Sequence, residues 1–522
     1  IANYCPRCGT SYSQLEINYV EKDDDLYYLD YKTIVIATTR PETIFADVAV
    51  AVNPKDKRYK KLIGETAKIP LVNRNVPIIE DNMVDKEYGT GALKITPAHD
   101  ATDFEIGQTN NLPLISVIDE TGRMTNAPKK YVGKKAEVAR EEVVADLKKA
   151  GIIKKTEKIH HAVGTCYRDH GIIEPMVSKQ WYIKVKPLTK LALTAISKKE
   201  VRFVAKKYQK IAIHWLKNLK DWNISRQIVW GIRIPAWRCQ KCMQFTITDG
   251  EVPKVCTKCK NSELLQDNDT FDTWFSSGQW PFATLQTTKP NDFSYFYPTS
   301  VMDPSYDILP FWVIRMLMLG PYKTKQVPFR NVLLHGLVRD KHGVKISKSK
   351  GNVIDPIDMI NKYGADALRV ALIWGSLVEN DNSVSEENIN GQRKFANKVW
   401  NVARFVLDNH ILSKPKQKIT NPDDKWILSE LNKTNIKVTK SLDEFRLNEA
   451  AEEIYDFIWH KFADVYIEST KTRRDEAQPT LLTVLNTSLK LLHPFMPFVT
   501  ETIWQEAKNE KLLINESWPK KI

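Results

Sequence analysis

The sequence lacks any apolar run that approaches the roughly 18 residues a membrane-spanning helix needs, and no secretory signal pattern opens it. Acidic residues are in deficit, because 63 Asp and Glu stand against 77 Lys and Arg, for a net charge of +14. A surplus of this sign favours a polyanionic partner through counterion release. We therefore expect a monomeric cytoplasmic protein that has no membrane segment and binds a nucleic acid.

Cysteine is also scarce, since seven occur in 522 residues, in patterns typical of metal ligands rather than disulfides. Cys239 and Cys242 are followed, after thirteen intervening residues, by Cys256 and Cys259. Thiolates at this spacing suit a tetrahedral zinc site in a short, turn-rich knuckle. We expect structural Zn²⁺ here, and the alternative is a remnant that once bound metal or a redox pair.

The remaining cysteines indicate another knuckle, the first along the chain, whose halves are far apart in the sequence. Cys5 and Cys8 form one half, and Cys166 begins another in which no fourth cysteine follows. Either Asp169 or His170 could complete the site, because carboxylate and imidazole both ligate zinc. We favour His170 as the fourth ligand, and a decayed knuckle held by packing alone is the other interpretation.

The hydrophobic pattern changes along a chain whose length allows three or four domains. Residues 15–29 alternate apolar and polar positions around three aspartates at 23–25, which predicts a strand hairpin. A buried strand at 33–37 and a helix at about 134–150, ended by Gly151, follow. Residues 268–375 have a doubly wound α/β pattern, and beyond about residue 385 apolar residues recur at helical spacing, which predicts a helix bundle.

A basic loop at residues 345–349, Lys-Ile-Ser-Lys-Ser, carries a strong chemical signal. Lys345 and Lys348 lie three positions apart and Ser349 follows them. A compact ammonium on a flexible stem suits a charge that must move with phosphates during phosphoryl or adenylyl transfer. Most short runs of this composition are solvated surface, so the loop gains its meaning from its neighbours.

Those neighbours carry a family resemblance. His335 and Gly336, followed by KHGVKISKSKGNVIDP at 341–356, resemble the signature loop of class I aminoacyl-tRNA synthetases, and look like the valyl branch of that class. The resemblance implies a Rossmann-type catalytic domain that uses ATP with Mg²⁺, valine and tRNA(Val). It also implies that Lys345, Lys348 and Ser349 are catalytic and that His335, Gly336 and Lys348 bind ATP.

Two further motifs, TTRPET at 38–43 and GTGALKITPAHDATDFE at 89–105, resemble the editing insertion shared by the valyl, isoleucyl and leucyl enzymes. By this resemblance, Asp103 would hold the α-ammonium of mischarged threonine. The other implied editing residues are Lys94, Thr96 and Asp100, which would read the threonine hydroxyl, and Thr38, Thr39 and Arg40, which would border the ester or the terminal adenosine.

A known physical argument about valine and threonine supports an editing site of this kind. A hydrophobic pocket cannot strongly exclude threonine, which is nearly isosteric with valine and adds one hydroxyl, so a second, polar site must hydrolyse the wrong product. The alternative is a β-rich domain whose Asp and Thr residues only cap helices and turns.

The resemblance extends to an amino-acid pocket, in which Trp274, Asp307 and Trp312 would surround a small aliphatic substrate. Ordinary core packing of the tryptophans is the alternative. Two positions depart from the family pattern: residues 302–305 replace a glycine-containing turn, and Pro310 replaces an aromatic residue.

The helical region after residue 385 corresponds in the family to a bundle that grips the anticodon stem and loop. Each of its basic side chains could instead be an ordinary solvated charge. The candidate phosphate contacts are Lys398, Arg404, Lys461, Lys471, Arg473 and Arg474.

One family element is missing, because nothing in the 522 residues fits the His-x-Gly-His motif of the nucleotide-binding fold. We expect a longer polypeptide or a separate N-terminal half to supply it, and we expect the isolated chain to be inactive in amino-acid activation. The alternatives are a stand-alone tRNA-binding deacylase, one half of a split synthetase and, less favoured, an isoleucyl or leucyl enzyme. The expected parts are a first zinc-knuckle half (1–14), an editing domain (15–155), a second zinc-knuckle half (156–175), a return to the catalytic domain (176–237), a second zinc knuckle (238–265), a Rossmann-type catalytic half with the basic loop (266–384) and an anticodon-binding helical bundle (385–522).

Overall fold

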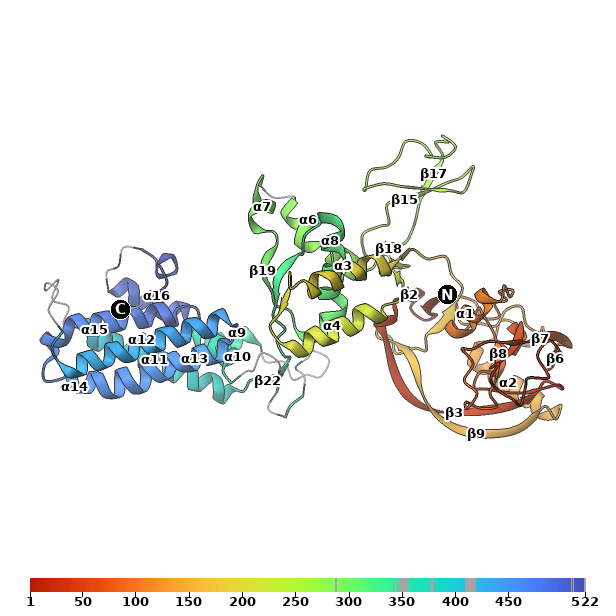
Figure 1. Ribbon diagram of the computed structural model, residues 1–522, viewed down its shortest axis with the longest axis horizontal. Helices are drawn as coiled ribbons and strands as arrows, with labels where there is room; N and C mark the ends of the chain where they lie inside the picture. The colour runs from red at the N-terminus through yellow and green to blue at the C-terminus, as the bar shows by residue number, and fades with distance from the viewer. Residues whose placement is uncertain are drawn as a thin grey trace. The chain divides into compact units, whose positions relative to one another are not determined.

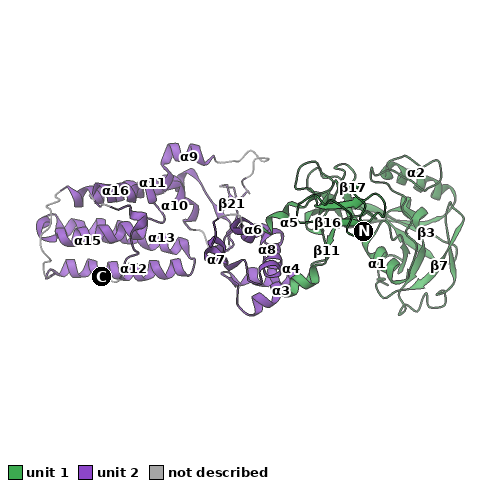
Figure 2. Ribbon diagram, turned by 90° about the horizontal axis from the view of Figure 1, so that it is seen from above, with its two compact units in different colours: residues 1–190, 218–280 green, residues 191–217, 281–522 purple. Residues whose placement is uncertain are grey.

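The computed structural model describes residues 1–522 except 287–288, 341, 345, 347–354, 376–379, 409–418, 508, 510 and 521–522. The chain divides into two compact units, one of residues 1–190 and 218–280 and the other of residues 191–217 and 281–522 (Figure 2). None of the described helices combines the length and the apolar character that a membrane span requires.

In the first unit, a four-stranded sheet lies beside the motifs of the expected editing site. Its order is β6 (Thr66–Ile69), β7 (Arg74–Glu80), β5 (Ala49–Val52) and β8 (Ala92–Ile95), with β5 and β7 parallel and the other pairs antiparallel. Val50 and Val52 pack into one apolar cluster, and Ala49 and Ala51 into another. Strand β5 is therefore covered on both faces, which explains its uninterrupted apolar sequence.

A second sheet, in the order β4 (Val35–Thr38), β3 (Ile17–Asp30) and β9 (Ile153–Cys166), is dominated by its two long strands. Figure 1 shows β3 and β9 as a long curved ribbon. The expected boundary between residues 155 and 156 falls inside β9, so the editing part and the knuckle part share this ribbon.

The predicted hairpin turn at residues 23–25 is wrong, because these aspartates continue β3 opposite residues 158–160 of β9. Asp23 Oδ1 lies 2.8 Å from His160 Nδ1, and Asp25 Oδ1 lies 2.9 Å from Lys158 Nζ. Cross-strand pairs of opposite charge stabilise a sheet. They offset the mutual repulsion of the acidic run and allow it to remain extended.

Two helices, α1 (Ala101–Thr109) and α2 (Ala136–Lys149), complete this module. The helix predicted over about 134–150 is confirmed by α2, whose buried Ala139, Val143 and Leu147 recur at helical spacing. Gly151 follows with φ +67°, a left-handed conformation that glycine adopts without strain. The strand predicted at 33–37 is confirmed by β4.

Two antiparallel three-stranded sheets carry the cysteine-rich turns. One has the order β10 (Glu174–Met176), β1 (Ala2–Cys5) and β2 (Thr10–Tyr12), and the other β16 (Phe245–Ile247), β15 (Ala236–Cys239) and β17 (Leu264–Gln266). The shorter elements of this unit are η1 (Gln14–Glu16), η2 (Pro41–Ala46), β11 (Tyr182–Ile183), β13 (Trp222–Asn223), β14 (Ser225–Arg226), β18 (Thr270–Phe271) and α5 (Thr273–Ser277).

The second unit contains a parallel sheet in the order β12 (Arg202–Phe203), β20 (Phe329–Val332) and β19 (Thr299–Met302). Parallel strands need a crossover connection, which the buried helix α8 (Ile314–Thr324) supplies between β19 and β20. This arrangement confirms the predicted α/β character. The remaining elements up to residue 383 are α3 (Val185–Ser197), α4 (Lys206–Asn218), α6 (Trp280–Gln286), α7 (Asp292–Phe296), η3 (Tyr306–Ile308), η4 (Leu309–Val313), β21 (Val338–Arg339), α9 (Pro356–Tyr363), α10 (Ala365–Ile373) and β22 (Asn382–Ser383).

Beyond residue 385 the described chain is helical, as predicted, and Figure 1 shows α11, α12, α13 and α15 running alongside one another. Their apolar faces meet in one core that includes Phe395, Leu431, Phe462 and Leu481. The elements are α11 (Glu386–Leu407), α12 (Pro422–Asp443), α13 (Leu447–Asp456), η6 (Phe457–Ile467), α14 (Glu468–Thr470), α15 (Arg474–Leu492), α16 (Pro497–Glu506) and η7 (Leu513–Asn515).

The bundle supplies internal partners for some of the candidate phosphate contacts. Arg473 Nη2 donates to Oδ1 of the buried Asp424 at 2.7 Å, and the hydroxyl of Tyr466 donates to the same oxygen at 2.7 Å. Arg473 therefore supports the packing of α12 against η6 and α15. Arg404, by contrast, is exposed on α11.

Candidate functional site

A cavity of about 420 Å³ opens in the first unit between the ends of β4 and β8 and the start of α1. Every residue predicted from the two editing-like motifs lines it. These residues are Thr38, Thr39, Arg40, Lys94, Thr96, Asp100 and Asp103. Segments 38–43 and 89–105 therefore meet in space, although more than forty residues separate them in the sequence.

Lys94, which lines this cavity, pairs with the carboxylate of Asp47, a residue that neither sequence motif includes. Its ammonium donates to Thr96 Oγ1 at 2.5 Å and to Asp47 Oδ1 at 3.3 Å. The hydroxyl of Tyr31 donates to the other oxygen of Asp47 at 2.6 Å. Burial raises the pKa of Asp47, although the nearby Lys94 opposes this effect. A buried carboxylate with such partners is a candidate for a structural role behind the site.

Asp103 enters the cavity from the first turn of α1. It is 4% exposed, and its Oδ2 accepts a hydrogen bond from the backbone N–H of Thr96 at 2.8 Å. Burial raises its pKa from 3.8 to about 7; Lys94 opposes the rise, and the charges of Asp100 and Asp47 add to it. A carboxylate with a raised pKa and few hydrogen-bond partners in the protein can bind the cationic group of a ligand.

Asp100 caps a helix, which is the alternative role that the sequence analysis gave for the Asp and Thr residues of this domain. Its Oδ1 accepts hydrogen bonds from the backbone N–H groups of Thr102 at 2.7 Å and Asp103 at 3.0 Å, which caps α1. The cap fixes the start of α1 and with it the position of Asp103. Asp100 also lines the cavity.

Arg40 lies at the opposite border of the cavity within a network of charges. Its Nη2 donates to Glu174 Oε2 at 2.6 Å, and its Nε donates to Glu42 Oε1 at 3.3 Å. Arg140 donates two hydrogen bonds of 2.8 Å to Glu42. Burial opposes ionisation of Glu42, but Arg140 and Arg40 lower its pKa. The backbone N–H of Arg40 also donates to Thr38 Oγ1 at 3.0 Å, so the loop after β4 is held in place.

His99 is a further cavity residue to which the sequence analysis gave no role. Its Nε2 accepts a hydrogen bond from the backbone N–H of Val117 at 2.9 Å, and Arg40 Nη1 donates to its carbonyl oxygen at 3.4 Å. Burial lowers the pKa of His99 to about 3, and the charges of Arg40 and Lys94 add to the effect. The imidazole is therefore neutral at physiological pH. Its position inside the second motif was the signal that could have identified it.

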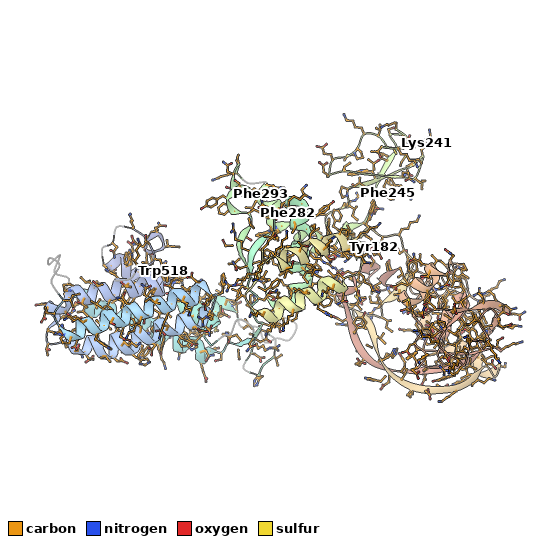
Figure 3. The ribbon with its side chains drawn as sticks, in the orientation of Figure 1. Tyr182, Lys241, Phe245, Phe282, Phe293 and Trp518 are labelled. Atoms are coloured by element: carbon orange, nitrogen blue, oxygen red, sulfur yellow. The ribbon has the colours of Figure 1, made fainter. Side chains whose placement is uncertain are left out.

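The second knuckle has a donor set that fits zinc. Cys239 Sγ lies 3.4 Å from Cys259 Sγ, and Cys242 Sγ lies 3.6 Å from Cys256 Sγ. Four thiolates at a zinc–sulfur distance of about 2.3 Å would stand about 3.8 Å apart. Lys241 and Phe245 mark this knuckle in Figure 3.

The first knuckle brings together Cys5, Cys8, Cys166 and Asp169, whose ligand atoms all lie within 4.8 Å of one another. His170, which we favoured from the sequence, is not a member of this group. Asp169 Oδ2 lies 3.4 Å from Cys8 Sγ and 3.6 Å from Cys5 Sγ. A carboxylate therefore stands where the fourth thiolate of a Cys₄ site would stand.

The turn geometry explains why Asp169, rather than His170, lies beside the three thiols. In each half-knuckle, the fifth residue donates its backbone N–H to the carbonyl of the first cysteine and has a positive φ. This fifth residue is Gly9, His170, Met243 or Lys260. The ligand positions are the first and the fourth, so Asp169 corresponds to Cys8, Cys242 and Cys259.

The residues expected to bind the amino acid and ATP are less completely described. Trp274 lies in α5 of the first unit, whereas Asp307 and Trp312 lie in η3 and η4 of the second unit. Lys345, Lys348 and Ser349 lie outside the described residues.

His335 and Gly336 line a separate cavity of about 270 Å³ in the second unit. A Cβ atom on Gly336 would lie 1.9 Å from the carbonyl oxygen of Asn380, so only glycine fits this close approach. Close packing against Asn380 therefore requires a glycine at position 336.

Comparison with known proteins gives the family. The profile described as tRNA synthetases class I (I, L, M and V) matches residues 1–385, and that described as anticodon-binding domain of tRNA ligase matches residues 424–522. A valine–tRNA ligase of Carboxydothermus hydrogenoformans is 47% identical over 100% of this chain and 61% of its own length. One of Pseudothermotoga lettingae is 45% identical over 99% of this chain and 62% of its own length. The chain thus spans about 60% of the length of these relatives.

Solved structures agree at the level of the fold. The LeuRS of Agrobacterium radiobacter K84, in a ternary complex with tRNA and LeuAMS, aligns with a TM-score of 0.51 and 19% identity, over 97% of this chain and 63% of that one. The methionyl-tRNA synthetase of Mycobacterium tuberculosis, bound by methionyl-adenylate, aligns with a TM-score of 0.50 and 17% identity over 65% of each chain. With the profile match over residues 1–385, these findings show that the chain belongs to the class I tRNA synthetases of the I, L, M and V group.

Proposed function

We propose that this chain is the larger part of a valine–tRNA ligase and that its cavity of about 420 Å³ hydrolyses mischarged threonyl-tRNA(Val). The observation that carries the proposal is the meeting of seven motif residues around one cavity in a chain that is 47% identical to a valine–tRNA ligase. This identity favours the valine enzyme over the isoleucyl and leucyl alternatives.

The proposed reaction is hydrolysis of the threonyl ester at the 3′ end of the tRNA. Asp103 receives the α-ammonium of threonine, since its carboxylate is buried and its one short hydrogen bond comes from a backbone N–H. Thr96, Lys94 and Asp100 provide polar atoms for the threonine hydroxyl. Valine has no such hydroxyl and gains no hydrogen bond from these groups, which is the physical basis for rejecting it.

The border formed by Thr38, Thr39 and Arg40 faces the ester and the terminal adenosine in this proposal. A water molecule adds to the ester carbonyl carbon, the bond from that carbon to the ribose oxygen breaks, and the ribose oxygen leaves as a hydroxyl. The guanidinium of Arg40, fixed by Glu174 and Glu42, offers positive charge to the developing oxyanion or to a phosphate.

The complete enzyme is proposed to form valyl-adenylate from valine and Mg-ATP and to transfer valine to tRNA(Val). Lys345, Lys348 and Ser349 would stabilise the transferring phosphates, and His335 and Gly336 would border the adenylate. Trp274, Asp307 and Trp312 would form the valine pocket. The part of the ligase outside this chain would supply the other phosphate-binding motif.

We also propose that two structural Zn²⁺ ions hold the knuckles. The ligand sets are Cys239, Cys242, Cys256 and Cys259 for one ion and Cys5, Cys8, Cys166 and Asp169 for the other. A metal in each site would cross-link the short strands and turns of its knuckle.

Deacylation of purified Thr-tRNA(Val) and Val-tRNA(Val) by the full chain tests the editing proposal. Rapid hydrolysis selective for threonine, and lost in Asp103→Ala, is the expected result. Asp119→Ala serves as a matched control, because Asp119 binds only the turn at residues 121–123 of the same module. Tight tRNA binding without hydrolysis would contradict the proposal.

A further inference from the structure

We propose that Asp47 is the positioning residue of the hydrolytic site, and that it holds the ammonium of Lys94 away from Asp103 so that Asp103 is free for the substrate's α-ammonium. The inference rests on the editing function proposed above. It assigns a role to a residue that belongs to neither sequence motif.

The first argument is the complete occupation of the Asp47 carboxylate. Its Oδ1 accepts hydrogen bonds from Lys94 at 3.3 Å and from Thr96 Oγ1 at 3.4 Å, and its Oδ2 accepts one from Tyr31 at 2.6 Å. Asp47 is 0% exposed and does not line the cavity. A substrate in the cavity cannot reach Asp47, so its effect must pass through Lys94 and Thr96.

The second argument is the rigidity of the support behind Asp47. It follows the 3-10 helix η2, and its backbone N–H donates to the carbonyl of Ile44 at 3.1 Å. Arg74 Nη2 donates to the carbonyl oxygens of Phe45 and Asp47, both at 2.8 Å. The carboxylate is therefore fixed by the backbone on one side and by Tyr31 on the other.

The third argument is the balance of charge around Lys94. One ammonium, 6% exposed, stands between two buried carboxylates, Asp47 and Asp103. Arg40 does not alter this balance, because Glu174 and Glu42 pair with it. One negative charge is thus left over, and a buried charge is stable only when it is paired. A substrate ammonium at Asp103 supplies that pairing.

The same balance predicts what happens without Asp47. A buried Lys94 would turn to the remaining carboxylate, Asp103, and occupy the place of the substrate ammonium. The defect would appear as weak substrate binding rather than as slow chemistry. Asp47 would then differ from a residue that only stabilises the fold, whose loss reduces the amount of active protein and leaves KM unchanged.

The test measures steady-state deacylation of Thr-tRNA(Val) by the full chain carrying Asp47→Asn or Tyr31→Phe, with Asp119→Asn as control. For Asp47→Asn we expect KM to rise on the order of 10–100-fold with a much smaller change in kcat. The reason is that Lys94 would form a charged hydrogen bond with Asp103 that the substrate ammonium must then displace. Tyr31→Phe, which removes only one hydroxyl from the network, should raise KM by a smaller factor. Asp119→Asn should match the unsubstituted chain.

A pH profile separates this role from a general loss of structure. The charged groups that act on Asp103 are Lys94, Asp100 and Asp47, and Arg40 and the neutral His99 line the same cavity. Loss of the Asp47 charge and approach of Lys94 both favour ionised Asp103. The acid limb of kcat/KM should therefore move to lower pH in Asp47→Asn.

The outcomes are distinct from those that test the function itself. If the unsubstituted chain does not hydrolyse Thr-tRNA(Val), the proposed function fails. If it does, and Asp47→Asn retains both KM and the acid limb, only the role of Asp47 is overturned. Should Asp47→Asn fail to fold, an unchanged KM in folded Tyr31→Phe would overturn the proposal, and a raised KM would support it.

Discussion

Asp103 is an ionisable group whose surroundings oppose its ionisation. Burial raises its pKa from 3.8 to about 7, so at higher pH the folded protein carries a buried carboxylate at a cost in stability. That cost is present above the folded pKa and disappears as the pH falls towards 3.8. Functional sites often retain such strain, because the unpaired charge is what binds the substrate.

The first prediction concerns Asp103→Asn. Asparagine can still accept the hydrogen bond from Thr96 but cannot pair with an ammonium, so deacylation of Thr-tRNA(Val) should fall on the order of 100-fold. The same variant should unfold at a higher temperature than the unsubstituted chain at pH 8, and this advantage should be clearly smaller at pH 5. Thermal unfolding at both pH values measures this difference, and equal destabilisation at both would refute the argument.

The raised pKa of Asp103 also predicts the direction in which catalysis changes with pH. Asp103 holds an ammonium only when it is ionised, so kcat/KM of the unsubstituted chain should decline as the pH falls below about 7. His99, with a pKa of about 3, stays neutral over this range and should contribute no step of its own. A rate profile from pH 5 to pH 9 tests both statements.

How far the sequence predicts a residue depends on whether a local pattern marks it. Lys94, Thr96 and Asp103 belong to one motif, and the cavity gathers them. Asp47 stands alone in an ordinary stretch and meets Lys94 only because β5 and β8 pair, a long-range contact that no local pattern reports. His170 was favoured on ligand chemistry, but the turn geometry gives the ligand position to Asp169.

At the level of elements, local patterns predicted the helices better than the long strands. The buried face of α2 repeats at helical spacing and was recognised from the sequence. The run of aspartates in β3 has the composition of a turn, yet β9 supplies His160 and Lys158 opposite it and keeps it extended. Cross-strand partners lie more than a hundred residues away, so composition alone misplaced this element.

The knuckle turns give a prediction at this scale. The full chain should bind two equivalents of zinc, measured by elemental analysis after dialysis against metal-free buffer. Asp169→Ala should lose about one equivalent and His170→Ala none, because only Asp169 occupies a ligand position. Asp169→Cys should retain both equivalents. If His170→Ala lost zinc and Asp169→Ala retained it, His170 would be the fourth ligand, as the sequence analysis favoured.

For the whole molecule, the two candidate sites belong to different compact units. The cavity lined by Asp103 lies in the first unit, and the cavity lined by His335 and Gly336 lies in the second. Each has its own set of polar residues. Under the proposed function, a substitution in one cavity should therefore abolish one activity and leave the other intact.

The last prediction tests this separation with Lys348→Ala in a ligase reconstituted with the part that lies outside this chain. By the family resemblance, Lys348 stabilises the departing pyrophosphate, so valyl-adenylate formation should fall on the order of 100-fold, as when one preorganised charge is removed from a transition state. Hydrolysis of Thr-tRNA(Val) should be unchanged, because the residues proposed for hydrolysis, at 38–40 and 94–103, do not include Lys348. Asp103→Ala should give the opposite pattern. Valine-dependent pyrophosphate exchange and deacylation, measured on the same preparations, distinguish the two, and a parallel loss of both activities in Lys348→Ala would show that the sites are not independent.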